Sequence, residues 1–410
     1  MQRKIILVDL LPVLPGGLNG GAKLMIMDLL KSMIDLTDEY EWYFCVRSGV
    51  EQELSILKHP NVHSFVMDSI PFQFPFKVGR AILSILRKRS YISNYLYRVF
   101  LAILNSRCFY KVKLPHQLQF DLLFCPFTEP VFHQKNIPTV AIIYDLQYLT
   151  YPSFFEFEDL LNRKYTMQHA CQKSTALVAI SEYSRKRTLE TQNISEEKIK
   201  TIPICLSQRL DNCLMSDNIF KKYHLQSQKY FIYPANFWKH KNHEMLILAF
   251  QLFLEKVDED FKLVLTGAPC ERQGFLKEVV YRKNLESSIL FLDYVSNDEL
   301  ALLMKNSLAL VFPSLYEGFG MPVVEAMALG VPVLSSNTTS LPEVAGSAAL
   351  LFDPKDLDSI VNAFLSMLRD TSLRTSMIEK GYQQAHQFSN VERMAYEYLE
   401  LFKQLIKETA

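Results

Sequence analysis

Short apolar runs alternate with longer amphipathic stretches along the whole chain. The apolar runs predict buried strands at residues 4–10, 42–47, 121–125, 138–144, 175–180, 230–234, 261–266, 308–312 and 331–335. Between most of them, apolar positions recur at three- and four-residue spacing. This spacing predicts helices, for example over 22–35, 157–171, 243–256, 297–305, 322–329 and 356–369. Apolar strands separated by helices are typical of parallel sheets covered on both faces. The pattern therefore predicts an α/β protein with doubly wound sheets.

A polar stretch interrupts this rhythm at residues 206–228. A chain of 410 residues is also long enough to favour two domains. We therefore predict a first Rossmann-like domain over 1–205, a linker over 206–228, a second Rossmann-like domain over 229–385 and a terminal segment over 386–410. Ligands bind at the carboxyl ends of the strands in such sheets. Two edges of this kind facing each other would form a cleft between the domains.

Composition narrows the functional classes only slightly. The chain is 49% hydrophobic and 21% charged with a formal net charge of zero, which is typical of a globular protein and predicts no nucleic-acid partner. Its seven cysteines are scattered without a C-x-x-C pair, a pattern that favours buried, reduced thiols in a cytoplasmic protein. The apolar N-terminus resembles a signal peptide, but Asp9 interrupts it, so a first strand is the favoured interpretation.

Residues 69–120 carry nine lysines and arginines and no acidic residue. Apolar positions at helical spacing and several aromatic residues accompany these charges. A basic, aromatic, amphipathic segment predicts contact with an anionic membrane surface, which would place the protein at the inner face of the membrane. Two alternatives stay open, namely a solvated basic face over an ordinary core and a basic pocket for an anionic acceptor.

The segment 313–330 contains the most informative pattern in the chain. It leads from a predicted strand through a turn with Glu317, Gly318 and Gly320 into a helix with Pro322 at its expected first position. The amides at this helix start would be unpaired donors at the positive end of the helix dipole, and they belong to Phe319, Gly320 and Met321. Such an arrangement predicts a phosphate site.

Two carboxylates flank this predicted phosphate site, Glu317 just before the helix and Glu325 one turn inside it. Carboxylates repel phosphate, so we expect them to accept hydrogen bonds from hydroxyl groups. A phosphate between two hydroxyl-bearing groups describes a nucleotide sugar. The alternative is that both residues are ordinary acids of a first helical turn, which the dipole favours.

Several motifs together resemble the retaining glycosyltransferases of family four. The longest spans 311–354 and includes Phe-Pro-Ser-Leu-Tyr-Glu-Gly-Phe-Gly-Met-Pro-Val-Val-Glu-Ala-Met and Ser-Leu-Pro-Glu-Val-Ala-Gly. The others are Gly20-Gly21, Val178-Ala179-Ile180-Ser181 with Tyr183-Ser184, Tyr233-Pro234-Ala235-Asn236 with Lys241-Asn242, Leu265-Thr266-Gly267, 291–300 and Phe388-Ser389. The resemblance implies the GT-B architecture of two facing Rossmann-like domains, with a C-terminal helix that crosses back to the first domain. It covers essentially the whole chain.

The same resemblance implies roles for individual residues. Glu325 would bind the ribose hydroxyls, Glu317 the transferred sugar, and Lys241 the diphosphate of the departing nucleotide. The remaining residues implied in donor binding are Gly20, Gly21, Asn236, Lys239, Gly267, Gly318 and Tyr294. Here Lys239 or His240 stands where relatives often carry an arginine. A surface lysine and a buried core tyrosine are the plain alternatives for Lys239 and Tyr294.

Tyr144-Asp145 departs from the family pattern, because relatives commonly have His-Asp at this point. Tyrosine is a poor base at neutral pH, since its ordinary pKa is near ~10. We therefore expect Tyr144 only to contact the sugar, while Asp145 or the donor phosphate takes the proton of the acceptor. No Asp-x-Asp ends a strand of the second domain, so we predict neither a metal nor a cofactor.

These observations predict a retaining hexosyltransferase that uses a nucleotide-diphosphate sugar and a glycan or lipid-linked acceptor. The Ser-Leu-Pro-Glu-Val-Ala-Gly variant resembles mannosyltransferase relatives and favours GDP-mannose, with a UDP-hexose as the rival donor. A nicotinamide dehydrogenase would need a G-x-G-x-x-G run, which the chain lacks. A non-catalytic sugar-nucleotide-binding or scaffold protein is the remaining alternative, suggested by Tyr144.

Overall fold

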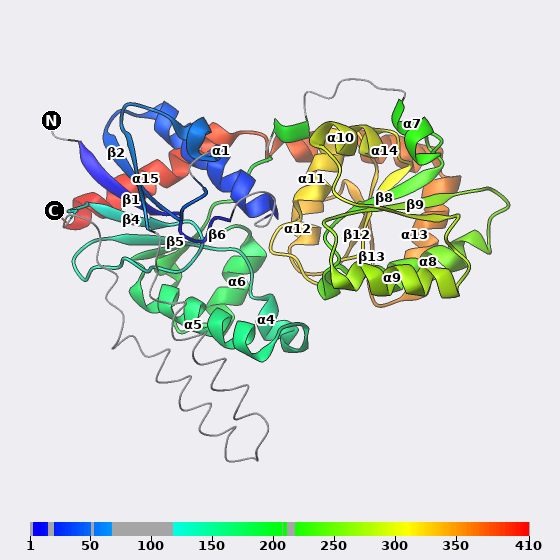
Figure 1. Cartoon of the computed structure of the whole chain (residues 1–410), viewed down its shortest axis with the longest axis horizontal. Coiled ribbons are helices and arrows are strands. Elements are labelled where there is room, and N and C mark those ends of the chain that lie inside the picture. Colours follow the sequence, from blue (N-terminus) through cyan, green and yellow to red (C-terminus); the bar gives the residue numbers. More distant parts are fainter. Residues whose placement is uncertain are drawn as a thin grey trace, which may run out of the picture.

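The computed structural model describes residues 3–14, 20–50, 53–67, 118–206, 208–210 and 218–409. These residues form two lobes, each built around one parallel sheet with helices on both faces (Figure 1). The predicted α/β fold with two Rossmann-like sheets is confirmed.

The N-terminal sheet has seven strands in the order β3-β2-β1-β4-β5-β6-β7. Its strands are β1 Lys4–Asp9, β2 Tyr40–Val46, β3 Val62–Val66, β4 Leu122–Cys125, β5 Thr139–Ile143, β6 Ala176–Ala179 and β7 Ile199–Thr201. Its helices are α1 Gly20–Leu36, α4 Gln147–Thr150, α5 Phe157–Lys173 and α6 Glu182–Thr191. Short 3-10 helices lie at Glu53–Leu57, Pro152–Phe154, Glu196–Lys198 and Gln208–Leu210.

The C-terminal sheet has six strands in the order β10-β9-β8-β11-β12-β13. Its strands are β8 Tyr230–Pro234, β9 Lys262–Thr266, β10 Ile289–Leu292, β11 Ala309–Phe312, β12 Val333–Ser336 and β13 Ala349–Phe352. The described helices after residue 210 are α7 Asn218–Tyr223, α8 His243–Leu254, α9 Glu271–Arg282, α10 Asn297–Lys305, α11 Met321–Ala328, α12 Leu341–Ala345, α13 Leu357–Arg369, α14 Thr371–His386 and α15 Val391–Thr409. A 3-10 helix lies at Lys239–Lys241.

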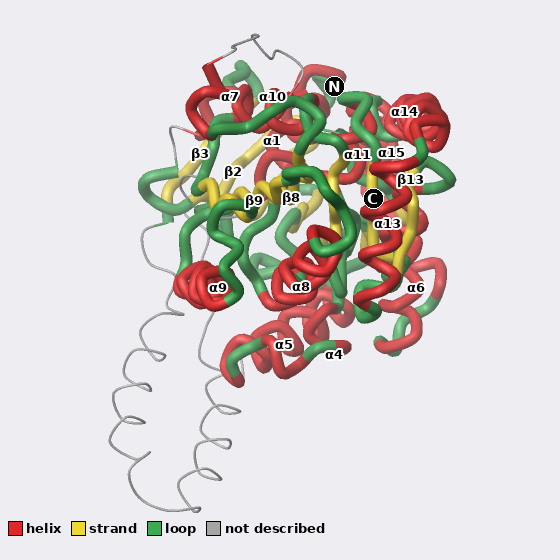
Figure 2. Tube along the Cα trace, turned by 90° about the vertical axis from the view of Figure 1, so that its right-hand side faces the viewer, coloured by secondary structure: helices red, strands yellow, loops and turns green. Residues whose placement is uncertain are grey.

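Side-chain alternation along β1 shows why the N-terminal sheet is covered on both faces. Ile6 and Val8 lie in the same buried cluster as the apolar residues of α1, whereas Leu7 lies in a second cluster with Met167 and Cys171 of α5. Figure 2 shows the strands of both lobes enclosed between helices. Both faces are therefore buried, as the apolar strands predicted.

The last helix returns to the first lobe. In Figure 1, α15 lies beside α1 in the N-terminal lobe, while α14 belongs to the C-terminal lobe and packs against α11 and α13. The ring of Phe124 on β4 contacts Tyr398 and Phe402 of α15, at centroid distances of 5.6 and 5.2 Å. The chain thus passes between the lobes twice.

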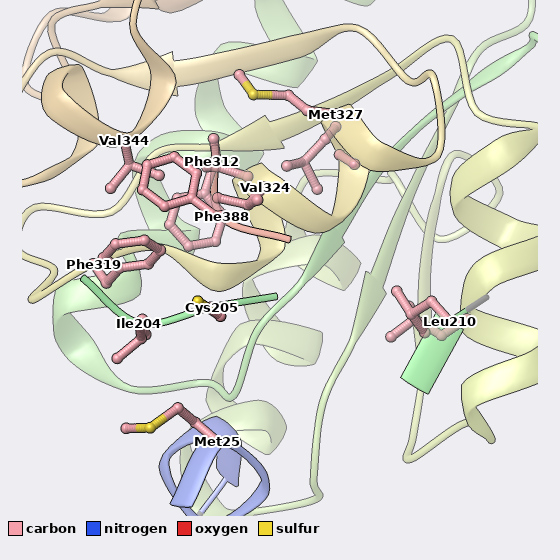
Figure 3. Packing of buried hydrophobic residues seen from close by; sticks show 14 of the residues in the cluster. Met25, Ile204, Cys205, Leu210, Phe312, Phe319, Val324, Met327, Val344 and Phe388 are labelled. Carbon is pink, nitrogen blue, oxygen red and sulfur yellow. The ribbon is translucent and has the colours of Figure 1, made fainter. Parts of the chain in front are cut away.

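The two passages lie against each other. The amide of Leu206 donates to the carbonyl oxygen of Phe388 over 2.7 Å. Phe388 also packs edge-to-face on Phe319, which follows β11, at a centroid distance of 5.3 Å (Figure 3). The crossover is therefore in direct contact with the start of α11.

The structure corrects several details. Helix α11 begins at Met321, so Pro322 occupies its second position rather than its first. Strands β3, β7, β10 and β13 were not predicted. Cys270 is exposed, unlike the described Cys45, Cys125, Cys171 and Cys205, which are buried and free as expected.

The predicted membrane segment 69–120 lies outside the described residues except for 118–120. Within the part of the chain that the structure describes, no helix has the length and apolar character needed to cross a bilayer.

Candidate active site

Residues 317–321, called the glycine loop below, form the last part of the connection from β11 to α11 and include Met321, the first residue of the helix. Gly320 caps the helix with φ of 115°, a left-handed conformation that a side chain would strain. A Cβ at this position would also lie 2.6 Å from the side chain of Leu341. The local sequence therefore needs glycine here, and the turn leaves the first amides of α11 at the end of the loop.

The segment after β12 holds the glycine loop from its own lobe. Thr339 Oγ1 accepts the amide of Glu317 over 3.1 Å. The buried hydroxyl of Ser340 lies 3.0 Å from the carbonyl oxygen of Glu317 and 2.9 Å from that of Phe319, and shares its proton between them. Sequence reasoning assigned no role to Thr339 or Ser340, since hydroxyl residues after a strand are common in ordinary turns.

The predicted residues Lys241 and Glu317 meet beside this loop. Lys241 Nζ donates to Glu317 Oε1 over 2.6 Å, and each side chain is 13% exposed. Asn242 follows in the left-handed region with φ of 61°, and its amide group donates to the carbonyl oxygens of Pro313 and Pro354. These bonds tie the lysine-bearing loop to the residues that follow β11 and β13.

Glu325 has a partner that the sequence did not predict. Arg209, in the short 3-10 helix between the lobes, donates from Nε and Nη2 to the two carboxylate oxygens over 2.7 and 2.8 Å. Glu325 is 2% exposed. Burial disfavours the charged guanidinium, but the facing carboxylate outweighs this effect and raises the pKa of Arg209. No periodic or motif signal marks Arg209, because it lies in a polar linker.

The phenol of Tyr294 also contributes to the raised pKa of Arg209. The side chain of Tyr294 is 72% exposed, so the alternative of a buried core tyrosine is wrong.

The opposite lobe reaches the glycine loop through Tyr144 and Asp145. A Cβ on Gly318 would lie 2.1 Å from the carbonyl oxygen of Tyr144 and 3.2 Å from Cβ of Asp145, so only glycine allows this approach. The hydroxyl of Tyr144 donates to the carbonyl oxygen of Pro126 over 2.8 Å, and burial raises its pKa. The backbone of Tyr144, rather than its hydroxyl, therefore faces the loop.

Asp145 accepts the amide of Gln147 at Oδ1 over 2.9 Å. Burial raises the pKa of its carboxyl group, and the hydrogen bond from Gln147 and the charges of Arg163 and Lys241 partly oppose this shift. Asp145 thus lies beside Gly318, the residue after Glu317, on the opposite lobe.

The remaining predicted residues occupy the ends of other elements. Asn236 Oδ1 accepts the amide of Ala268, and a Cβ on the neighbouring Gly267 would lie 2.5 Å from the carbonyl oxygen of Ala235. Lys239 is exposed. Burial and the charge of Lys241 lower the pKa of His240 to about 2, so this imidazole is neutral at physiological pH.

Gly20 and Gly21 begin helix α1 rather than forming a turn. A Cβ on Gly21 would meet no described atom within 4 Å, so the described chain itself does not require glycine there.

Comparison with known proteins gives a family match for the second lobe. The family described as Glycosyl transferases group 1 matches residues 215–384, which include Lys241, Glu317 and Glu325. O-antigen chain mannosyltransferase B of Escherichia coli is 32% identical over 255 residues, or 61% of this chain and 66% of that protein. Over residues 215–384, the chain is therefore similar to the group 1 glycosyl transferases.

Other relatives carry similar names. O-antigen chain mannosyltransferase RfbU of Salmonella typhimurium is 26% identical over 274 residues, or 66% of this chain and 71% of that protein. Serotype-specific mannosyltransferase WbdA of Escherichia coli is 27% identical over 67% of this chain but only 35% of its own length. The chain thus matches slightly less than two thirds of mannosyltransferase B and about one third of WbdA.

Solved structures of glycosyltransferases share the fold. Sucrose-phosphate synthase of Thermosynechococcus elongatus superimposes with a TM-score of 0.71 at 17% identity, covering 99% of this chain and 100% of that one. Anabaena HepE, solved in complex with UDP and glucose, gives a TM-score of 0.68 at 17% identity over 98% and 100% of the two chains. The expected resemblance to a mannosyltransferase-like family with GT-B architecture is confirmed.

Proposed function

We propose that this glycosyltransferase moves a hexose from a nucleotide-diphosphate sugar to a hydroxyl of a glycan or lipid-linked acceptor in cell-surface polysaccharide synthesis. The observation that carries the proposal is the close Lys241–Glu317 pair beside the glycine loop. This pair offers a cation for a diphosphate and a carboxylate for sugar hydroxyls next to the amides that lead into α11. The names of the O-antigen mannosyltransferase relatives support GDP-mannose as donor. The complex of HepE with UDP and glucose keeps a UDP-hexose as the rival.

The arrangement suggests how the groups would act. Lys241 and the glycine-loop amides would stabilise the negative charge that develops on the departing nucleotide. Glu317 would then exchange its bond with Lys241 for a hydroxyl of the sugar. Asp145, whose pKa burial raises, or the donor phosphate would take the acceptor's proton. Departure and attack on the same face of the sugar would retain its anomeric configuration.

We propose further that the reaction needs no bound metal and no cofactor. The described residues contain no group of three or more His, Cys, Asp or Glu side chains arranged to hold a metal ion. Turnover measured with and without EDTA, and again with added Mg²⁺, tests this part. Loss of turnover in EDTA that Mg²⁺ restores would contradict it.

A thermal-shift screen across GDP-mannose, GDP, UDP-glucose, UDP and their relatives tests the donor. We expect the largest rise in Tm with GDP-mannose or GDP. Slow hydrolysis of that donor, followed by NMR, would then report the anomeric configuration of the released sugar. An initially inverted product would reject the retaining mechanism.

The second candidate is a non-catalytic sugar-nucleotide-binding protein, favoured only by the engaged hydroxyl of Tyr144. Hydrolysis that disappears in Glu317→Ala and Lys241→Ala supports the enzyme. A folded protein that binds the donor but never turns it over, whichever acceptor is supplied, supports the binding protein.

We propose a cytoplasmic location at the inner face of the membrane. Co-sedimentation with anionic but not neutral liposomes would support the contact with the membrane, and equal, negligible binding to both would reject it.

A further inference from the structure

Two sequence motifs with no assigned role contact each other across the lobes. The stretch 178–184 ends β6 and begins α6, and the stretch 340–346 contains α12. The carboxylate of Glu343 accepts the amides of Glu182 over 2.8 Å and of Tyr183 over 3.0 Å. These are the first two amides of α6, which have no partner within their helix. A carboxylate at this end of the helix dipole makes charge-assisted hydrogen bonds.

The start of α6 is bonded to the glycine loop as well. The buried hydroxyl of Ser181 donates to the carbonyl oxygen of Gly318 over 2.8 Å and accepts the amide of Ser184 over 3.1 Å. The buried hydroxyl of Ser184 donates to the carbonyl oxygen of Tyr144 over 2.9 Å. Ser181, Ser184 and the end of β5 thus surround Gly318 from the N-terminal lobe.

Because a peptide unit is planar, holding a carbonyl oxygen also fixes the direction of the next amide. The bond from Ser181 to the Gly318 oxygen therefore aims the N–H of Phe319. The bond from Ser340 to the Phe319 oxygen likewise aims the N–H of Gly320. The amide of Phe319, just before the helix cap, is thus oriented from the other lobe, and the amide of the cap residue Gly320 is oriented from its own lobe.

We propose that Ser181 and Glu343 are positioning residues for the donor site. Glu343 fixes the first turn of α6, this turn places Ser181, and Ser181 orients the Phe319 amide toward the diphosphate. The segment 339–343 thereby serves both lobes, since Ser340 holds the glycine loop and Glu343 holds α6. The inference rests on the proposed function for what the loop binds, but not for the contacts themselves.

Amide hydrogen exchange of the free full-length protein tests the positioning. In Ser181→Ala and Glu343→Ala we expect exchange at residues 318–321 to rise about tenfold, beyond any change in global stability. Glu343→Gln keeps one acceptor oxygen and should give an intermediate rise. Glu379→Gln, which changes an exposed glutamate of α14, should change nothing. Faster exchange at the start of α6 with unchanged exchange at 318–321 would overturn the proposal.

Isothermal titration with the nucleoside diphosphate that the wild type binds gives the second readout. We expect Ser181→Ala and Glu343→Ala to weaken binding about three- to tenfold, with partial recovery in Glu343→Gln. Unchanged affinity in all three would contradict the proposed link to the donor. A wild type that binds no nucleoside diphosphate would reject the proposed function, while the exchange result would still decide whether Ser181 and Glu343 position the loop.

Discussion

Arg209 occupies both carboxylate oxygens of Glu325, the residue implied in binding ribose. The two N–H groups of a guanidinium match a carboxylate in its plane, so this pair is strong and directional. Glu325 is 2% exposed, and both of its carboxylate oxygens already accept from Arg209. If Glu325 binds ribose, we therefore expect the nucleotide to compete with Arg209.

Arg209→Gln removes this competitor. We expect affinity for the preferred nucleoside diphosphate to rise about three- to tenfold, because Glu325 then gains partners only from the ligand. The free protein should lose about 1–3 kcal/mol of stability, since a buried carboxylate is left unpaired. Titration calorimetry and urea denaturation measure the two effects.

Arg282→Gln is the matched control, because Arg282 is exposed on α9 and pairs with Glu278 in the same helix. It should change neither quantity appreciably. Weaker nucleotide binding in Arg209→Gln would show instead that Arg209 contacts the nucleotide.

The Lys241–Glu317 pair predicts strong coupling between two substitutions. Lys241→Ala and Glu317→Ala should each reduce donor turnover at least 100-fold, a loss of about 2.7 kcal/mol of transition-state stabilisation. The stability losses of the two single variants should add up to more than the loss in the double variant. Each single substitution leaves one largely buried charge unpaired, whereas the double substitution removes both charges. Turnover and urea denaturation of all four proteins in the cycle decide both points. Strict additivity of stability would contradict a direct interaction.

The sequence predicted those parts of the fold that are continuously apolar. β1, β4, β5 and β11 are buried along most of their length, and this burial dictates their composition. β3 was missed because His63 and Ser64 are exposed on an edge strand, so its composition is not constrained in that way. β7 has only three residues, too few for a pattern.

The candidate site likewise contains residues that the sequence could predict and residues that it could not. Gly318, Gly320, Glu317 and Glu325 are close in sequence, so local spacing placed them together. Arg209 is 116 residues from Glu325, and Ser181 is 137 residues from Gly318. Such pairs depend on how the two lobes meet, which no local pattern records. Lys241 could be assigned only through the family resemblance.

Gly318 predicts a steric effect on how the lobes meet. In Gly318→Ala the new Cβ would lie 2.1 Å from the carbonyl oxygen of Tyr144, which is backbone and cannot turn aside. We expect the lobes to separate, so the radius of gyration in small-angle X-ray scattering should increase and donor turnover should fall at least 100-fold.

Gly274→Ala in α9 is the control, because a Cβ there meets nothing within 4 Å. It should leave scattering unchanged and stabilise the helix by about 0.5–1 kcal/mol. Unchanged scattering and turnover in Gly318→Ala would contradict the close contact.

Asp9, at the end of β1, predicts a stability that depends on pH. Burial raises the pKa of its carboxyl group to about 7, and Oδ2 has no hydrogen-bond partner among the described residues. The native state therefore keeps a proton that the unfolded state loses near pH 4, so this contribution is complete below pH 4 and is lost as the pH rises through 7. Asp9→Asn is neutral at every pH, and its stability relative to the wild type should rise by roughly 2–3 kcal/mol between pH 5 and pH 8. His240 and His243, whose pKa values burial lowers to about 2 and about 3, destabilise the fold as the pH falls below 6.5, but they are present in both proteins and cancel in the difference. Urea denaturation at the two pH values measures that difference, and a value independent of pH would show that Asp9 ionises normally in the folded protein.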